Sequence, residues 1–173
     1  MGNSDGQDWV AFTGHRPQIL GGFDPNAPMN LRVRAWLDKT IERLAREGRT
    51  TFVSGGALGV DQWAALSVLS YPFLDLVLAL PYGDYGGNWP PESQAVLQGI
   101  REKAKTVHIV CEGAYENWKN TERNKWMVDH SSLLCAVWTG QKDGGTAHCV
   151  KYAKAQGKTI IRYNPVSDQE EPA

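Results

Sequence analysis

The chain has 173 residues, which is long enough for one domain with a sizeable buried core. Lysine and arginine number 18 against 19 aspartate and glutamate residues, so no overall positive field would attract nucleic acid or an anionic membrane surface. The three cysteines lack CxxC spacing and no apolar stretch is long enough to cross a bilayer, so we expect a cytoplasmic protein without structural disulfides or a membrane partner.

Six short apolar runs predict β-strands separated by helical patterns. Near-continuous apolar character, as in residues 74–80, is typical of a strand that is covered on both faces. The strand predictions are 9–13, 50–54, 74–80, 106–111, 133–138 and 159–163. The helix predictions are 30–47 with Asn30 as its N-cap, 57–69, a helix starting at Pro90 and Pro91, about 117–130, and 146–156.

The alternation of strands and helices predicts an α/β fold, a single doubly wound domain with a mainly parallel sheet of about six strands flanked by helices. We expect this domain to span residues 9–165, between a disordered tail at 1–8 and a C-terminal tail at 166–173 with a frayed end. Long loops at 18–29 and 82–91 follow strand ends, and loops of that length in a compact domain are usually functional.

The first predicted strand ends in a polar turn that contains Gly14, His15 and Arg16. Arginine offers a planar fork of donors for phosphate, and His15 suits phosphate donation or proton transfer. The alternative is a tight turn whose arginine pairs with a local carboxylate. We favour ligand binding, because the carboxyl edge of a parallel sheet is where ligands dock.

The second strand ends in another glycine-rich turn, which opens a helix. No lysine follows its glycines, so it is not a Walker loop, but its N–H groups and hydroxyl suit phosphate or ribose. Asp61 suits either a ribose hydroxyl or the stabilisation of its own helix. The candidate ligand-binding residues of this turn are Ser54, Gly55, Gly56, Gly59 and Asp61.

A third turn, with Gly144, Gly145 and Thr146, follows the fifth predicted strand. A simple helix cap would need only Thr146, so the paired glycines favour phosphate binding. Tyr82 and Trp89 lie in the long loop after the third strand and suit either stacking on a purine or packing of the loop.

On the helix predicted over 117–130, Arg123 has two interpretations. It would reach the carboxyl edge of the sheet, or it would belong with Glu122 and Asp129 to a solvated helix face. The sequence pattern alone favours the solvated face. The histidines lack partners at metal-ligand spacing, and His108 fits a core position within a strand. We therefore expect no metal site and no cofactor.

Taken in order, these motifs resemble the SLOG superfamily, which groups the DNA-processing protein DprA (also called Smf) with the LOG phosphoribohydrolases, and in particular its YpsA-like branch. The segments that carry the resemblance are FTGHRP at 12–17, SGGALGVDQWAA at 54–65, RNKWM at 123–127 and DGGT at 143–146. The similarity runs from about residue 9 to residue 163. It implies a Rossmann-like fold whose glycine-rich turns bind a nucleotide or a nucleotide-derived ligand, and a homodimer.

In LOG enzymes a helix arginine and a glutamate act together on the N-glycosidic bond. The resemblance carries the arginine to Arg123, whereas His148 or Cys149 stands where the glutamate would be. Histidine does not replace a carboxylate that stabilises an oxocarbenium-like centre and steers water, so a hydrolase would need a substitute acid. The candidates are Asp61, Glu92 and Asp129.

Residues and resemblance together leave three functions open. The first, which we favour, is a binding module or sensor for a nucleotide or nucleotide sugar. The second is a nucleotide N-glycosidase with Arg123 and Asp61 as catalytic residues. The third is single-stranded DNA binding of the DprA kind, which requires a basic groove beside the glycine turns and does not suit the charge balance.

Overall fold

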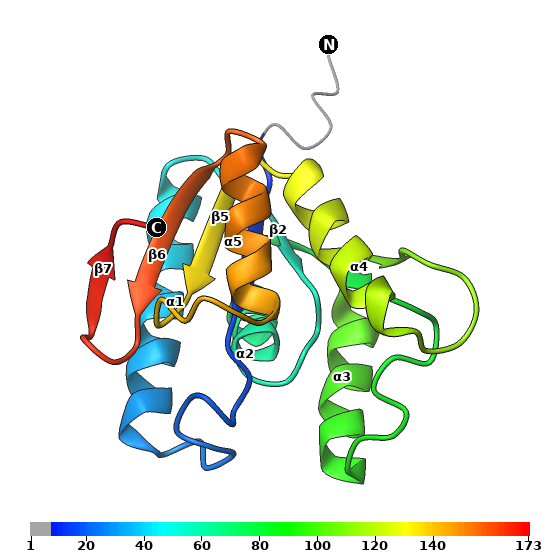
Figure 1. Ribbon diagram of the computed structural model, residues 1–173. Coiled ribbons are helices and arrows are strands. Elements are labelled where there is room, and N and C mark those ends of the chain that lie inside the picture. Colours follow the sequence, from blue (N-terminus) through cyan, green and yellow to red (C-terminus); the bar gives the residue numbers. More distant parts are fainter. Residues whose placement is uncertain (1–7) are drawn as a thin grey trace.

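The computed structural model describes residues 8–173, so all but the last residue of the predicted tail at 1–8 lies outside the described residues (Figure 1). Within this part of the chain, strands and helices alternate up to the last two strands. The strands are β1 (Val10–Gly14), β2 (Thr51–Ser54), β3 (Asp75–Leu80), β4 (Thr106–Ile109), β5 (Leu133–Val137), β6 (Thr159–Asn164) and β7 (Gln169–Glu171). The helices are α1 (Pro28–Arg46), α2 (Val60–Leu69), α3 (Pro91–Lys103), α4 (Asn117–Asp129) and α5 (Gly145–Ala155).

One sheet contains all seven of these strands, in the order β4-β3-β2-β1-β5-β6-β7. The pairings from β4 through β6 are parallel, and β7 alone runs antiparallel to its neighbour β6. The predicted α/β class and the mainly parallel, doubly wound sheet are thereby confirmed, with one strand more than the six that the apolar runs predict.

The extra strand corrects the prediction of a frayed C-terminal end. Glu171 of β7 accepts hydrogen bonds from the amide of Asn164 at 3.2 Å and forms an ion pair of 3.3 Å with Arg162 of β6. The run Gln-Glu-Glu has no apolar alternation, so its sequence pattern does not indicate a strand. Polar side chains, rather than a buried face, hold it against the sheet.

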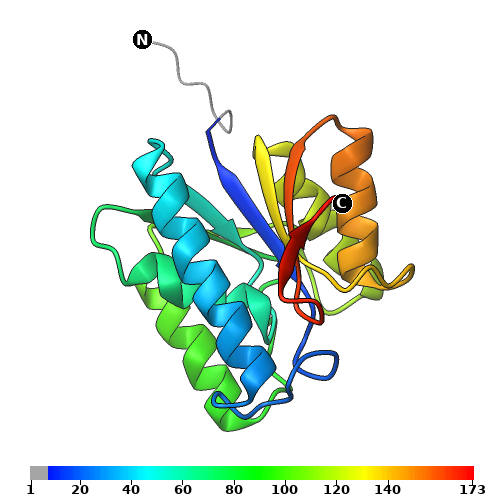
Figure 2. The ribbon, with the colours of Figure 1, turned by 90° about the vertical axis from the view of Figure 1, so that its left-hand side faces the viewer.

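The sheet lies between two layers of helices. Figure 2 shows α1 and α3 on one side of the strands and α5 on the other. Residues of α1, α2 and α3 pack on one face of the sheet in a core where the rings of Phe12 and Phe52 stack 5.9 Å apart. Residues of α4 and α5, including Met127 and Val150, build the second core on the opposite face. Two covered faces explain why β1, β3 and β5 are nearly continuous apolar runs.

The prediction of Asn30 as a helix cap is wrong, because α1 begins at Pro28 and its N-cap is Ala27, three residues before Asn30. Asn30 lies inside the first turn and is fully buried. Its Oδ1 accepts the N–H of Gly21 at 2.9 Å, and its Nδ2 donates to the carbonyls of Gly22 and Asp24 at 2.9 and 2.8 Å. Asn30 therefore fastens the loop between β1 and α1 rather than the helix end.

The strand order places a topological switch point between β1 and β5. The chain builds outward from β1 to β4, and α4 then returns it to the far side of β1, where β5 pairs from Val10↔Leu133 to Gly14↔Val137. The connections that leave these two strands diverge, which opens a crevice at their carboxyl ends. Within residues 8–173 no helix is both long enough and apolar enough to cross a membrane.

Candidate functional site

A cleft of about 990 Å³ lies at this switch point. Its walls come from the turn after β1, the first turn of α2, one face of α4 and the start of α5. Of the predicted site residues, the cleft brings together Gly14, His15, Arg16, Asp61, Arg123, Gly144, Gly145 and Thr146.

His15 links the two strands that border the cleft. Its backbone N–H donates to Val137 O at 3.3 Å, and its Nε2 accepts the backbone N–H of Thr139 at 3.0 Å. Nε2 is therefore unprotonated and the ring is neutral. Burial lowers the pKa of His15 below its ordinary value, which agrees with this state. His15 lines the cleft, but its Nε2 is already used between the two turns.

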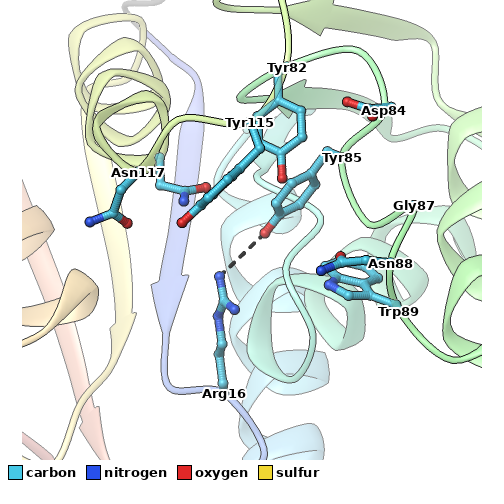
Figure 3. Close-up of a pocket in the computed structure, with 10 residues that line it drawn as sticks. Arg16, Tyr82, Asp84, Tyr85, Gly87, Asn88, Trp89, Tyr115 and Asn117 are labelled. Carbon is cyan, nitrogen blue, oxygen red and sulfur yellow. Dashed lines mark hydrogen bonds between the residues drawn. The ribbon is translucent and has the colours of Figure 1, made fainter.

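Arg16 is exposed and borders a second cavity of about 600 Å³ as well as the first. Its Nη2 donates to the hydroxyl of Tyr85 at 3.5 Å, so its partner is not the local carboxylate of the alternative interpretation. Figure 3 shows this guanidinium pointing toward Tyr85, with Tyr115 and Asn117 on one wall and Trp89 on the other.

Four of the ten residues that line the second cavity are aromatic. Tyr82 meets Tyr85 edge to face at 5.5 Å and Tyr115 at 5.7 Å, and Tyr85 meets Trp89 at 5.1 Å. Tyr82 and Trp89, predicted as stacking residues, thus belong to this cavity and not to the cleft that holds the glycine turns. Tyr85 and Tyr115 were not among the predicted site residues.

The turn after β2 is folded on itself. The Ser54 hydroxyl is buried, donates to Asp61 O at 2.7 Å and accepts the N–H of Gly56 at 3.2 Å. Val60 N, at the start of α2, donates to His15 O at 3.4 Å. Ser54, Gly55, Gly56 and Gly59 are not among the residues that line either cavity. They shape the turn that places Asp61 in the cleft wall.

Arg123 lies beneath this turn and is 3% exposed, so its interpretation as a solvated helix charge is wrong. Its Nη1 donates to the carbonyls of Gly55 and Ala79, and its Nε donates to Asn124 Oδ1 at 2.9 Å. Its guanidinium carbon lies 5.6 Å from the ring centre of Tyr85, whose hydroxyl faces Arg16. Arg123 thus joins α4 to the ends of β2 and β3.

Asp61 supplies the carboxylate of this turn and is influenced by the charge of Arg123. Burial raises the pKa of Asp61, while Arg123, the N–H of Ala57 and Arg16 act in the opposite direction. Of the three predicted substitute acids, Asp61 alone lines the cleft. Asp129 ends α4 and accepts the hydroxyl of Tyr152 at 2.8 Å, and Glu92 lies exposed in the first turn of α3.

The start of α5 opens onto the cleft. Gly144 is the N-cap residue of α5 and has φ +105°, a backbone conformation that residues with a side chain rarely adopt. No side chain forms a capping hydrogen bond at this helix end. Thr146 is buried inside the first turn and is not the cap that the sequence suggests. The opening N–H groups of a helix have no partner within it and carry its positive dipole end. Glycine leaves room for a ligand to approach them.

A stripe of polar residues on α4 was not among the predicted site residues. Residues 117, 120, 121 and 124 recur at i, i+3, i+4 and i+7, and all line the large cleft. This periodicity was visible in the sequence, but a polar helix face usually faces solvent. The members of the stripe are Asn117, Asn120, Thr121 and Asn124.

Within residues 8–173, no group of three or more His, Cys, Asp or Glu residues is placed to hold a metal ion.

A doubly wound parallel sheet with a large cleft at its switch point defines a Rossmann-like α/β protein. Residues 10–165 match the model of the YpsA family, described as the YspA SLOG family, and the chain belongs to this family. This confirms the resemblance noted in the sequence.

Similar curated proteins are named UPF0398 proteins. The UPF0398 protein of Bacillus pumilus (strain SAFR-032) is 26% identical over 164 residues, which are 92% of this chain and 88% of that protein. The UPF0398 protein of Leuconostoc citreum (strain KM20) is 30% identical over 141 residues, covering 79% of this chain and 74% of the relative.

Solved structures of DNA processing protein A share the fold. The Helicobacter pylori protein, described with a unique single-stranded DNA binding mode, gives a TM-score of 0.65 at 19% identity, over 90% of this chain and 65% of that chain. DprA from Streptococcus pneumoniae gives a TM-score of 0.62 at 16% identity, over 90% of this chain and 50% of that chain. The chain therefore spans between half and two thirds of these DprA chains.

Proposed function

We propose that this protein binds a nucleotide or a nucleotide-derived ligand in the switch-point cleft. The observation that carries the proposal is the convergence of an exposed arginine, Arg16, and the glycine-flanked start of α5 on one cleft. Both are suited to the oxygens of a phosphate group. The adjoining cavity supplies the aromatic faces on which a base would stack.

The lining of the cleft carries charges of both signs. Arg16 and Arg123 share its lining with three acidic side chains, and a fourth, Asp84, borders the neighbouring cavity. A groove that tracks a nucleic-acid backbone is positively charged along its length. This mixed lining argues against single-stranded DNA binding as the main function. The three acidic residues of the cleft are Asp61, Glu116 and Asp143.

Thermal unfolding in the presence of nucleoside mono-, di- and triphosphates and dinucleotides tests the proposal. A ligand that binds only the native state stabilises it by about 2.7 kcal/mol at 100 times its Kd. For a chain of this size that corresponds to a rise in Tm of roughly 5–10 °C. We expect Arg16→Ala to lower the affinity at least tenfold, and Arg34→Ala, on the exposed side of α1, to leave it unchanged.

Two results would contradict the proposal. The first is that no nucleotide of the panel raises the Tm of the wild-type protein. The second is that Arg16→Ala and Arg34→Ala change the nucleotide affinity by the same amount. A labelled thymidine oligonucleotide that binds with strong salt dependence while nucleotides do not would instead favour the DprA-like function.

Asp61 supports a second candidate, hydrolysis of the N-glycosidic bond of the bound nucleotide. A carboxyl group whose pKa is raised by burial is suited to donate a proton to a departing base. We expect such an enzyme to release free base from a nucleoside monophosphate, detected by liquid chromatography. Asp61→Asn would then abolish release while binding persists. Binding without release by the wild-type protein would leave the binding module as the function.

A further inference from the structure

Three residues, Arg16, Asn117 and Asn120, line both cavities. The aromatic cavity and the switch-point cleft therefore share a wall, and a ligand long enough to enter both must pass these side chains. In Figure 3, Arg16 approaches from below the aromatic cavity, and Asn117 faces it from the α4 side. The shared wall is the point where the two parts of such a ligand would be joined.

Asn120 is distinctive within this shared wall. Its Oδ1 is completely buried and has no hydrogen-bond partner within residues 8–173. Arg123, by contrast, which follows one turn later on α4, has carbonyl partners for its Nη1. A buried carbonyl oxygen without a donor costs free energy, and such a group in a native protein calls for an explanation. A ligand that supplies an O–H or N–H would satisfy it.

The order of chemical groups along the site sets the class of that donor. Aromatic rings line one end, and the start of α5 with Gly144 and Gly145 lines the other, with Asn120 between them. In a nucleotide the base and the phosphate are likewise separated by a sugar. The sugar of a ribonucleotide carries hydroxyl donors, one of which a deoxyribonucleotide lacks.

We propose that Asn120 determines sugar specificity, with its Oδ1 accepting a ribose hydroxyl of a ribonucleotide. The base then lies among Tyr82, Tyr85 and Trp89, and the phosphate lies at Arg16 and the start of α5. This assignment rests on the proposed function, and it adds an orientation of the ligand and a preference for ribonucleotides.

Titration calorimetry with matched ribo- and deoxyribonucleotides tests the assignment. The probes are the best-binding ribonucleotide of the thermal panel and its 2′-deoxy and 3′-deoxy forms. We expect the wild-type protein to bind one deoxy form about tenfold more weakly, the cost of about one hydrogen bond of 1.4 kcal/mol. In Asn120→Leu the ribonucleotide should lose this advantage, so that the ribo-to-deoxy ratio of affinities falls to about one.

Two further variants separate recognition from folding. Asn120→Leu removes a buried acceptor that has no donor, so without ligand it should melt at or above the wild-type temperature. Asn120→Asp keeps a carbonyl acceptor, and it should retain the ribo-to-deoxy ratio even if its charge weakens phosphate binding. Gln98→Leu makes the same change of amide to leucine on the exposed face of α3 and should alter neither Tm nor the ratio.

Failure of this assignment can be distinguished from failure of the proposed function. Equal binding of ribo- and deoxyribonucleotides by the wild-type protein overturns the role of Asn120 and leaves nucleotide binding intact. A ratio that persists in Asn120→Leu also overturns it. No binding of any nucleotide overturns both.

Discussion

Gly55 lies at a crowded point of the site. A Cβ built there would lie 2.6 Å from Arg123 Nη1 and 2.8 Å from Asp61 Oδ2. Arg123 cannot move aside freely, because the same Nη1 donates to the carbonyls of Gly55 and Ala79. The absence of a side chain at Gly55 thus allows a buried arginine and a buried carboxylate to flank the same turn.

We therefore expect Gly55→Ala to destabilise the protein by about 1–3 kcal/mol through overpacking. Gly99 on α3 is the matched control, because a Cβ there meets no atom within 4 Å. Gly99→Ala should stabilise the protein by about 0.4–1 kcal/mol, since it restricts the unfolded chain. Urea unfolding measures both, and equal effects of the two substitutions would contradict the crowding at Gly55.

His15 makes stability depend on pH. Its folded-state pKa is lowered by burial, so below pH about 6.5 the unfolded chain binds more protons than the native chain does. Stability should therefore fall as the pH drops from about 6.5 toward the lowered pKa, and be fully present above that range. Protonation would also place a donor at Nε2 opposite the N–H of Thr139.

We expect His15→Gln, whose amide oxygen can still accept a hydrogen bond but does not titrate, to flatten this dependence between pH 5 and 7. His148→Gln, on the exposed side of α5, is the control and should keep the wild-type slope. Chemical unfolding at a series of pH values measures the slopes. His108, whose pKa is also lowered by burial and by His130, accounts for the slope that persists in the variant.

Asn30 of α1 holds the loop between β1 and α1 in place through hydrogen bonds. Three hydrogen bonds between buried Asn30 and the loop backbone, two donated and one accepted by its amide, hold the segment that follows Arg16 and Pro17. Asn30→Ala would remove all three and leave the N–H of Gly21 without its partner. We expect a loss of about 2–3 kcal/mol in the free energy of unfolding, at roughly 1 kcal/mol per bond.

The same substitution should weaken ligand binding, because the loop positions Arg16. Asn26→Ala is the control, since Asn26 is exposed in the same loop and contributes only its backbone N–H to Asp24. A circular-dichroism melt and the nucleotide titration measure the two effects. An Asn30→Ala protein of wild-type stability would show that the loop is held by other contacts.

At the scale of elements, the sequence predicts what depends on local periodicity. Apolar runs such as 74–80 and glycines such as Gly48, which follows α1, determine elements within a few residues of their predicted bounds. The features that the sequence does not indicate depend on contacts between residues that are far apart in the chain. Arg123 resembles any helix charge until β2 and β3 supply its carbonyl partners, and β7 has no pattern until β6 lies beside it.

The same contrast between local pattern and distant contacts applies to the candidate site. Glycine turns at strand ends correctly indicate which edge of the sheet to inspect, because parallel strands share one carboxyl edge. They do not indicate which turn faces the cleft and which is folded on itself. Ser54 and Gly144 both stand in glycine-rich turns, yet the Ser54 hydroxyl is used within its turn and Gly144 opens onto the cleft. Only the order of the strands separates the two cases.

For the whole molecule, the switch point gathers segments that are far apart in the chain. Hydrogen–deuterium exchange with and without a bound nucleotide should therefore show protection in three separate peptides, covering residues 14–18, 117–124 and 143–147. Residues 166–173, which border neither cavity, serve as the internal control and should exchange equally in both states. Protection confined to one of the three peptides would mean that the ligand contacts a single turn and that the elements at the cleft do not act as one site. Protection of the control peptide alone would place the ligand at the outer strand of the sheet, β7.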